Sequence, residues 1–207
     1  MNILLSHGSP DDAHRQALDE LAQAVSTELG EAVGTAFLDD ALPQGARVLP
    51  LLLGRGRHSD RDVPAMIEAA GAELLTGPAG HPAAMADMAF ELAQQKRGKQ
   101  RAVMFALYRL SAAQALMAEL YERSKKFSLP AIAGLHGQCD VASVLRLWAD
   151  EGLKEALIQP VLLFPGHSLQ TLEDAGVQSG LDVAIGPVLC EHSGLAAWLA
   201  ERFREAV

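Results

Sequence analysis

The chain has 207 residues, a length that fits one domain or two lobes of about 100 residues and is sufficient to bury a hydrophobic core. Hydrophobic residues make up 49% and charged residues 21%, a composition that excludes an intrinsically disordered chain. The formal net charge of −9 excludes a general nucleic-acid binder, because such proteins need a basic face to displace counterions.

The two cysteines and the N-terminus indicate the cellular compartment. Cys139 and Cys190 have no metal-ligand spacing, so we expect neither a disulfide scaffold nor a zinc ribbon. Residues 1–5 lead directly into a short apolar run, with no basic segment and no apolar stretch long enough for a signal or a membrane span. These features predict a cytoplasmic protein with reduced thiols and no membrane contact.

The first half alternates short apolar runs with longer amphipathic stretches, a pattern typical of a parallel sheet flanked by helices. In the first helix we expect Ser9 to be the N-cap and His14 to be exposed. Only about eight residues separate the second and third strands, although a parallel crossover normally needs a dozen or more. The predicted strands are 3–5, 35–38, 47–53 and 74–75, and the predicted helices are 11–29, 60–70 and 83–95.

The second half repeats this order of elements. The predicted strands are 102–107, 131–135, 157–164 and 183–185, and the predicted helices are 111–126, 141–154, 169–178 and 194–206. The fold class is therefore α/β, with two similar lobes, each a small parallel sheet flanked by helices, and with a cleft between the lobes.

An internal repeat supports the two lobes. Residues 46–93 can be laid over residues 156–205 with one or two short gaps. We therefore predict an N-terminal lobe at 1–97 and a degenerate repeat lobe at 98–207, joined by a basic, glycine-containing segment at 96–101. The matched positions are Pro50 with Pro160, His58 with His167, and Gly77-Pro78 with Gly186-Pro187.

Two histidines follow apolar strands in the first lobe. His7 lies between the strand 3–5 and the helix 11–29, and His58 follows the strand 47–53. In an open α/β sheet, ligands bind outside the carboxyl ends of the strands. A lone histidine at such a place is more often a capping or core residue, but the segments around these two change that balance in favour of a functional site.

Four segments carry a family resemblance: LLSHGS with His7, AFLDDALP with Asp39, PLLLGRGRHSDRDVP with His58, and GPAGHP with His81. Together they resemble the small class II chelatases, which insert cobalt or iron into sirohydrochlorin. Long members of that family are internal duplications, whereas short members pair as dimers. The resemblance implies a chelatase-like lyase of cobalamin or siroheme biosynthesis, acting as a monomer because the duplication supplies both lobes.

The resemblance also implies roles for particular residues. His7 and His58 are the candidate catalytic residues and metal ligands, since imidazole binds divalent cobalt, nickel or iron and can accept a pyrrole proton. Asp39 is a weaker third ligand, in a place where the family usually has Glu. The metal is a substrate, with Co²⁺ expected first and Fe²⁺ or Ni²⁺ as alternatives.

The expected partner is an anionic tetrapyrrole. Sirohydrochlorin has a rim of carboxylates, and three arginines surround His58 in this acidic protein, although such a charged loop is as readily explained as a solvated one. A backbone-binding role at a helix start is an equally good explanation for His81, and also for His192 in the second lobe. The candidate substrate-binding residues are Ser9, Arg55, Arg57, Arg61 and His81.

The second lobe lacks the equivalent of the HGS segment, because its first strand ends FALYRL. His167 is therefore interpreted as a relic of the repeat, and His136 lies roughly where Asp39 does in the first lobe. The first lobe is the expected catalytic one, and the second mainly closes the cleft.

Other functions remain open. A non-catalytic relative that binds metal or tetrapyrrole would explain the short 38–47 connection, where the family usually has a helix, and the FALYRL strand end. The sequence of residues 166–170, GHSLQ, approaches the nucleophile elbow of an α/β-hydrolase esterase but lacks its final glycine. A histidine phosphatase would need Arg where Ser6 stands. No P-loop or GxGxxG follows a strand, so no organic cofactor or nucleotide is implied.

Overall fold

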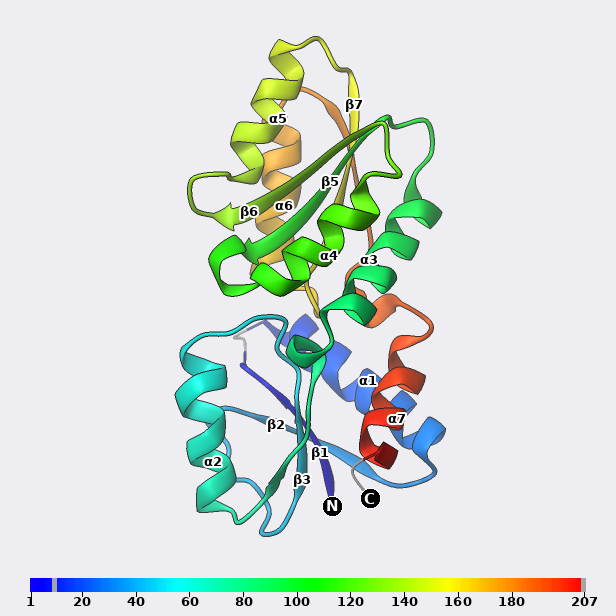
Figure 1. The fold of residues 1–207 in the computed structure, drawn as a ribbon. Helices are drawn as coiled ribbons and strands as arrows, with labels where there is room; N and C mark the ends of the chain where they lie inside the picture. The colour runs from blue at the N-terminus through cyan, green and yellow to red at the C-terminus, as the bar shows by residue number, and fades with distance from the viewer. Residues whose placement is uncertain (9–10, 206–207) are drawn as a thin grey trace. The chain divides into compact units, whose positions relative to one another are not determined.

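The computed structural model describes residues 1–8 and 11–205. The chain forms two compact units, one made of Met1–His81 with the segment that starts at Ser193, the other of Pro82–His192. Each unit is a four-stranded parallel sheet with helices on both faces, which confirms the predicted fold class (Figure 1). None of the described helices is long and apolar enough to cross a membrane.

The sheet of the first unit has the order β2-β1-β3-β4. Its central strand, β1, is buried along its whole length. Helices α1 and α7 pack together over one face, and α2 contributes to the apolar cluster on the other. The elements are β1 (Asn2–Ser6), α1 (Asp12–Leu29), β2 (Val33–Phe37), β3 (Arg47–Pro50), α2 (Val63–Ala69), β4 (Glu73–Leu74) and α7 (Leu195–Glu205).

Helix α1 begins and ends with clear signals. The side chain of Asp11 accepts a hydrogen bond of 2.9 Å from the Ala13 amide, so Asp11 is the N-cap that we had predicted at Ser9. Ser9 itself lies outside the described residues. Gly30, with a φ of 76°, ends the helix in the left-handed conformation that glycine adopts without strain.

The connection from β2 to β3 is a loop and contains no helix. The nine residues 38–46 return across one face of the sheet, where Leu42 packs against the buried apolar cluster that includes Ala46 and Val48. Nine extended residues span about 30 Å, more than the length of a five-residue strand, so a loop suffices where most crossovers use a helix. The loop therefore covers part of the face that a crossover helix would cover.

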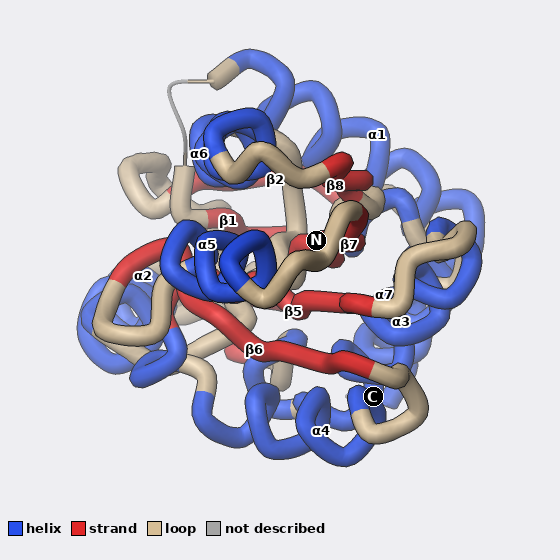
Figure 2. The backbone as a smooth tube through the Cα atoms, turned by 90° about the horizontal axis from the view of Figure 1, so that it is seen from above, coloured by secondary structure: helices blue, strands red, loops and turns tan. Residues whose placement is uncertain are grey.

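The second unit repeats the sheet, with the order β6-β5-β7-β8. Helices α3 and α4 pack on one face, and α5 and α6 pack on the other; Figure 2 shows α4 and α5 on opposite sides of β5 and β6. The identical strand order supports the duplication. The elements are α3 (Pro82–Lys96), β5 (Ala102–Arg109), α4 (Gln114–Ser124), β6 (Leu129–His136), α5 (Val141–Asp150), β7 (Glu155–Pro160), α6 (His167–Gln178) and β8 (Asp182–Ile185).

Two strands are shorter than their apolar runs predicted. β3 ends at Pro50 rather than at residue 53, and β7 ends at Pro160 rather than at 164. One further amide in each case still bonds to the central strand, Leu51 to Leu5 and Val161 to Ala106. The apolar residues beyond them are loop that is buried after β7 and partly buried after β3, so their composition reports burial and not strand structure.

The compact units do not follow the predicted division near residue 97. Helix α3, from the first half of the sequence, packs within the second unit, and α7, from the second half, packs within the first. Each sheet is thus completed by a helix of the other repeat. The boundaries 1–97 and 98–207 stay a prediction about the repeats, and the chain passes between the units at His81–Pro82 and His192–Ser193.

Candidate functional site

The carboxyl edge of the first sheet gathers the ends of β1, β2 and β3. In the parallel register Ser6 pairs with Phe37 and Leu5 pairs with Pro50, so the segments that follow these strands leave the same edge. His7 directly follows β1 and is exposed. Gly8, with a φ of 79°, turns the chain after it, and a Cβ there would lie 3.7 Å from the Phe37 ring.

The His7 ring has one nitrogen committed to the backbone. Its Nδ1 lies 2.5 Å from the Gly8 carbonyl oxygen. A carbonyl oxygen only accepts hydrogen bonds, so Nδ1 carries the proton and donates it. Within the part of the chain that the structure describes, no group bonds to Nε2. The lone pair of Nε2 is therefore available to a metal ion or a proton.

The His58 ring also has its Nδ1 committed as a donor, in this case to a carboxylate. His58 opens a short π-helical turn, His58–Asp62, and its Nδ1 donates a hydrogen bond of 2.8 Å to Asp62 Oδ2. The hydrogen bond from His58, followed by the charge of Arg57, holds the pKa of Asp62 below its ordinary value. An ionised carboxylate only accepts, so Nδ1 carries the proton and Nε2 keeps its lone pair.

Two residues of this edge were given no role from the sequence. Asp62 stands in the quoted motif, and its spacing of four residues from His58 was the available signal. His14 was expected to be exposed but is only 4% accessible, and it shares a buried hydrogen bond of 2.9 Å between its Nε2 and Ser6 Oγ. Its spacing from Leu18 and Leu21 on the buried face of α1 would have indicated burial.

Asp39 lies in the turn after β2 and is exposed. The neighbouring Asp40 stabilises that turn, because its Oδ2 accepts a hydrogen bond of 2.8 Å from the Phe37 amide. No cluster of three or more His, Cys, Asp or Glu side chains suited to a metal ion occurs among residues 1–8 and 11–205. His7, His58 and Asp39 are thus not assembled as a ready three-ligand site.

The three arginines around His58 are all exposed. Arg57 pairs with the same carboxylate as His58, with 3.6 Å between its Nε and Asp62 Oδ1. Arg55 and Arg61 have no carboxylate partner in the described chain. They are the two cations of this loop that could meet an anionic ligand without first breaking an ion pair.

His81 follows the short 3₁₀ turn Pro78–Gly80 and does not directly follow a strand. Its amide donates to the Pro78 carbonyl, and its ring contacts the Trp198 ring edge-on, with 5.3 Å between ring centroids. The backbone bond is the alternative that the sequence left open for this residue. His192, expected to behave similarly, pairs through Nε2 with Glu91 at 3.0 Å.

The corresponding edge of the second sheet has different residues. Tyr108 and Arg109 end β5, and the exposed His136 ends β6 with its ring 5.1 Å from that of Tyr108. His167 begins α6, as His58 begins its own turn. Ser168 forms no side-chain hydrogen bond among the described residues, so the nucleophile-base contact of a hydrolase is not present there.

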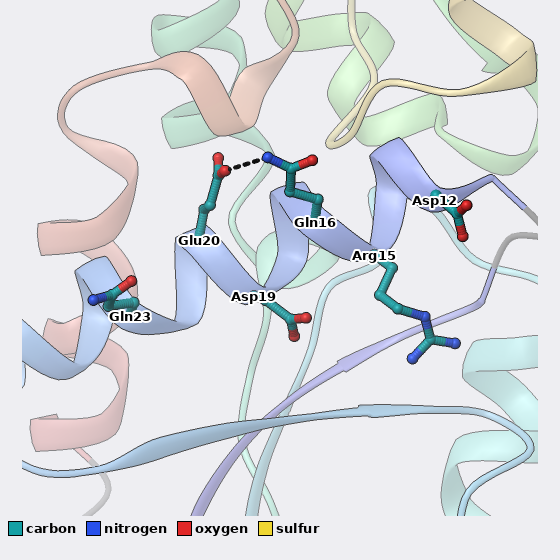
Figure 3. A pocket seen from close by; sticks show the side chains of 6 residues that line it. All are labelled: Asp12, Arg15, Gln16, Asp19, Glu20 and Gln23. Atoms are coloured by element: carbon teal, nitrogen blue, oxygen red, sulfur yellow. Dashed lines mark hydrogen bonds between the residues drawn. The ribbon is translucent and has the colours of Figure 1, made fainter.

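A surface hollow lies on the exposed side of α1 (Figure 3) and does not include the strand-end histidines. Two of its polar side chains have partners: Gln16 donates to Glu20 at 2.8 Å, and Asp19 accepts from Thr35 at 2.9 Å. An open polar helix face of this kind carries no chemistry of its own. Its lining residues are Asp12, Arg15, Gln16, Asp19, Glu20 and Gln23.

The model of the CbiX family matches residues 1–96. Among solved structures, the chain is similar to CbiX, described as the terminal enzyme for biosynthesis of siroheme in denitrifying bacteria, with a TM-score of 0.74, 19% identity and 100% of both chains covered. SirB from Bacillus subtilis with Fe³⁺ gives a TM-score of 0.77 at 14% identity, over 99% of this chain and 95% of that chain.

The sirohydrochlorin chelatase SirB from Bacillus subtilis subspecies spizizenii, in complex with cobalt, gives a TM-score of 0.69 at 16% identity, over 99% of this chain and 95% of that chain. No curated protein matches the sequence. At these identities the solved structures establish the fold. The chain thus has the two-lobed α/β fold of these chelatase structures. Residues 1–96, somewhat less than half of the 207-residue chain, are similar to the CbiX family.

Proposed function

We propose that the protein inserts a divalent metal ion into sirohydrochlorin or a related tetrapyrrole, with Co²⁺ as the first expectation and Fe²⁺ or Ni²⁺ as alternatives. One observation carries the proposal. His7 and His58 follow neighbouring strands of one sheet, and each has Nδ1 committed as a donor so that Nε2 keeps its lone pair. The metals named with the SirB structures, Fe³⁺ and cobalt, support this range of metals.

The two Nε2 atoms can act twice in this reaction. The hydrated metal ion exchanges water for imidazole nitrogen, which holds it at the edge of the sheet with positions open for the macrocycle. As the pyrrole nitrogens replace the imidazoles, two N–H protons leave the macrocycle. Each imidazole that releases the metal regains a lone pair and can accept one of these protons. Asp39 as a third ligand stays a prediction.

Arg55 and Arg61 supply the proposed contacts to substrate. Arg55 lies in the loop before the His58 turn and Arg61 lies within that turn, and neither is paired with a carboxylate of the described chain. A guanidinium binds a carboxylate in a two-pronged geometry, which orients as well as attracts. The rim carboxylates of the macrocycle are the groups that these arginines would hold.

The direct test mixes purified protein with sirohydrochlorin and Co²⁺ and follows the visible absorption of the macrocycle against a control without protein. We expect faster metallation with the wild-type chain and no acceleration with His7→Ala or His58→Ala. His167→Ala is the matched control, because His167 starts α6 as His58 starts its turn, and we expect it to keep the wild-type rate.

The same experiment separates the competing functions. A spectral shift of the macrocycle without metallation would favour a non-catalytic binding protein. Absence of acceleration with Co²⁺, Fe²⁺ and Ni²⁺ alike would contradict the proposed function. Loss of activity in His167→Ala but not in His58→Ala would place the site in the second unit.

A further inference from the structure

We propose that Ser6 and His14 form a positioning pair that fixes the orientation of the His7 imidazole. The inference rests on the proposed role of His7 in holding the metal and accepting a proton. Neither Ser6 nor His14 touches the reacting atoms, so both would act through His7 alone.

The pair is buried where an apolar contact would be expected. Ser6, the last residue of β1, is 1% exposed and His14 is 4% exposed, and their hydrogen bond joins Oγ to Nε2 across 2.9 Å. The other buried residues of α1 are Leu18, Leu21, Ala22 and Val25, which fill the same helix face with apolar groups. Burying a polar pair at the end of such a face costs desolvation, which its hydrogen bond helps to offset, so apolar packing alone does not explain the pair.

The His14 ring is held so that it meets His7. The two ring centroids lie 5.2 Å apart with planes inclined at 64°, an edge-on contact. The centroid of the Phe37 ring lies 6.2 Å from that of His14, and the Phe37 ring is also near the place where a Cβ of Gly8 would stand. The hydrogen bond to Ser6 restrains rotation of the His14 ring. The edge-on contact with His14 then limits rotation of the His7 ring.

This arrangement gives the exposed His7 ring a fixed orientation that its own turn does not provide. The bond from His7 Nδ1 to the Gly8 carbonyl is made to a neighbouring residue in a turn, so by itself it leaves the ring free to swing with the turn. His14 belongs to α1 and Ser6 to the central strand, both rigid elements. Ligand orientation from such supporting residues is commonly worth about 10–100-fold in metal affinity or activity.

The test compares Ser6→Ala, His14→Ala and His14→Phe with the wild-type chain. The ring nitrogen chemical shifts of His7 in the metal-free protein report its tautomer, and Co²⁺ titration and insertion kinetics report its function. We expect a mixture of tautomers and a loss of about 10–100-fold in Co²⁺ affinity and insertion rate for Ser6→Ala and His14→Ala. His14→Phe keeps a ring beside His7 and should lose less, and Ser6→Thr, which restores the hydroxyl, should recover the Ser6→Ala loss.

A matched control separates positioning from stability. Ser26 also lies on α1 and makes partly buried hydrogen bonds, donating to the Ala22 carbonyl and accepting from the Val33 amide. Ser26→Ala should lower the free energy of unfolding but leave the His7 tautomer and the Co²⁺ affinity unchanged. If His14→Ala does not fold, Ser6→Ala and His14→Phe are compared with the wild-type chain instead.

The outcomes also separate this inference from the proposed function. A single wild-type tautomer that becomes mixed in Ser6→Ala and His14→Ala supports the positioning pair even if the wild-type chain accelerates no insertion, a result that would remove only the function. Unchanged tautomer and Co²⁺ affinity in folded Ser6→Ala and His14→Phe would overturn the positioning pair, whatever the activity.

Discussion

His58 Nδ1 donates a hydrogen bond of 2.8 Å to Asp62 Oδ2 within a single π-helical turn. The contact spans four residues, so the proposed ligand His58 and the carboxylate that orients it come from one short segment. Such turns are rare and occur often at functional sites. The segment after β3 thus carries its own orienting carboxylate.

Asp62→Asn should weaken metal insertion while the chain remains folded. The amide can still reach His58, but it can donate as well as accept, so it no longer fixes the proton on Nδ1. We expect a loss of about 10–100-fold in Co²⁺ affinity or insertion rate, measured by titration and by initial rates.

Asp60→Asn is the matched control for Asp62, because Asp60 lies in the same turn and accepts only from the neighbouring Ser59 hydroxyl. It should leave both quantities near their wild-type values. Equal losses in Asp60→Asn and Asp62→Asn would mean that the turn responds to its total charge and not to the bond with His58.

The stability of the protein should fall between pH 6.5 and about 4 because of His14. Burial, and next the charge of His7, lowers the pKa of His14 from 6.5 to about 4. Over that range the unfolded chain binds a proton that the folded chain does not, so acid favours unfolding. This contribution is fully present above pH 6.5, decreases as the pH falls, and is constant again below about 4.

Urea unfolding at pH 7.5 and pH 5 measures the effect. His14 should account for a loss of about 2 kcal/mol between these two pH values, which follows from about 1.4 kcal/mol per pH unit below the unfolded pKa. His14→Phe has no titrating group there and should show a smaller difference between the two pH values. The same difference in both chains would assign the acid sensitivity to other groups.

Arg123 links α3 to α4 within the second unit. Its side chain bonds to Asp87 on α3 and to Glu119 on α4, both at 2.6 Å, and it also donates to the Ala83 carbonyl. The hydrogen bond from Arg123 holds the pKa of Asp87 below its ordinary value. Because the Arg123 side chain is only 16% exposed, Arg123→Met should lower the free energy of unfolding by about 1–2 kcal/mol.

Lys125 provides the comparison for Arg123. It pairs at 2.7 Å with Glu122 of its own helix, and both side chains are more than half exposed. Lys125→Met should change the free energy of unfolding by at most about 0.5 kcal/mol, measured by the same urea unfolding. A loss in Arg123→Met no larger than in Lys125→Met would show that the contact between α3 and α4 is mainly apolar.

The order of strands and helices could be predicted from the sequence, because apolar runs and amphipathic stretches report burial directly. The ends of β3 and β7 could not, since the apolar residues beyond Pro50 and Pro160 are themselves buried or partly buried. The exchange of α3 and α7 could not either. Both helices have an apolar face, and nothing local in an amphipathic helix states which of two similar sheets it will cover.

The sequence likewise predicted some features of the candidate site and not others. The strand-end positions of His7 and His58 followed from periodicity, whereas the protonated nitrogen of each ring follows only from the acceptor that it meets, the Gly8 carbonyl or the Asp62 carboxylate. The burial of His14 was available from its helical spacing. Its bond to Ser6 was not, because it joins two elements across the Gly8 turn.

Gly77 should be the glycine least tolerant of substitution at the carboxyl edge. A Cβ at Gly77 would lie 2.0 Å from the Pro50 carbonyl oxygen, a backbone atom at the end of β3 that cannot move without the strand. At the matching position of the repeat, a Cβ at Gly186 would meet Gln159 Oε1 at 2.2 Å. That side chain is fully buried and donates to the Pro160 and Pro187 carbonyls, so it can yield only by losing bonds.

We therefore expect Gly77→Ala to lower the free energy of unfolding by about 3 kcal/mol or more, and Gly186→Ala by about 1–3 kcal/mol. Gly56→Ala is the control, because no heavy atom lies within 4 Å of its Cβ position, and it should change stability by less than about 0.5 kcal/mol. Urea unfolding of the three variants gives the order. A Gly77→Ala chain as stable as Gly56→Ala would mean that the turn at Gly77 moves away from Pro50, and the carboxyl edge would then be more compliant than its close backbone contact indicates.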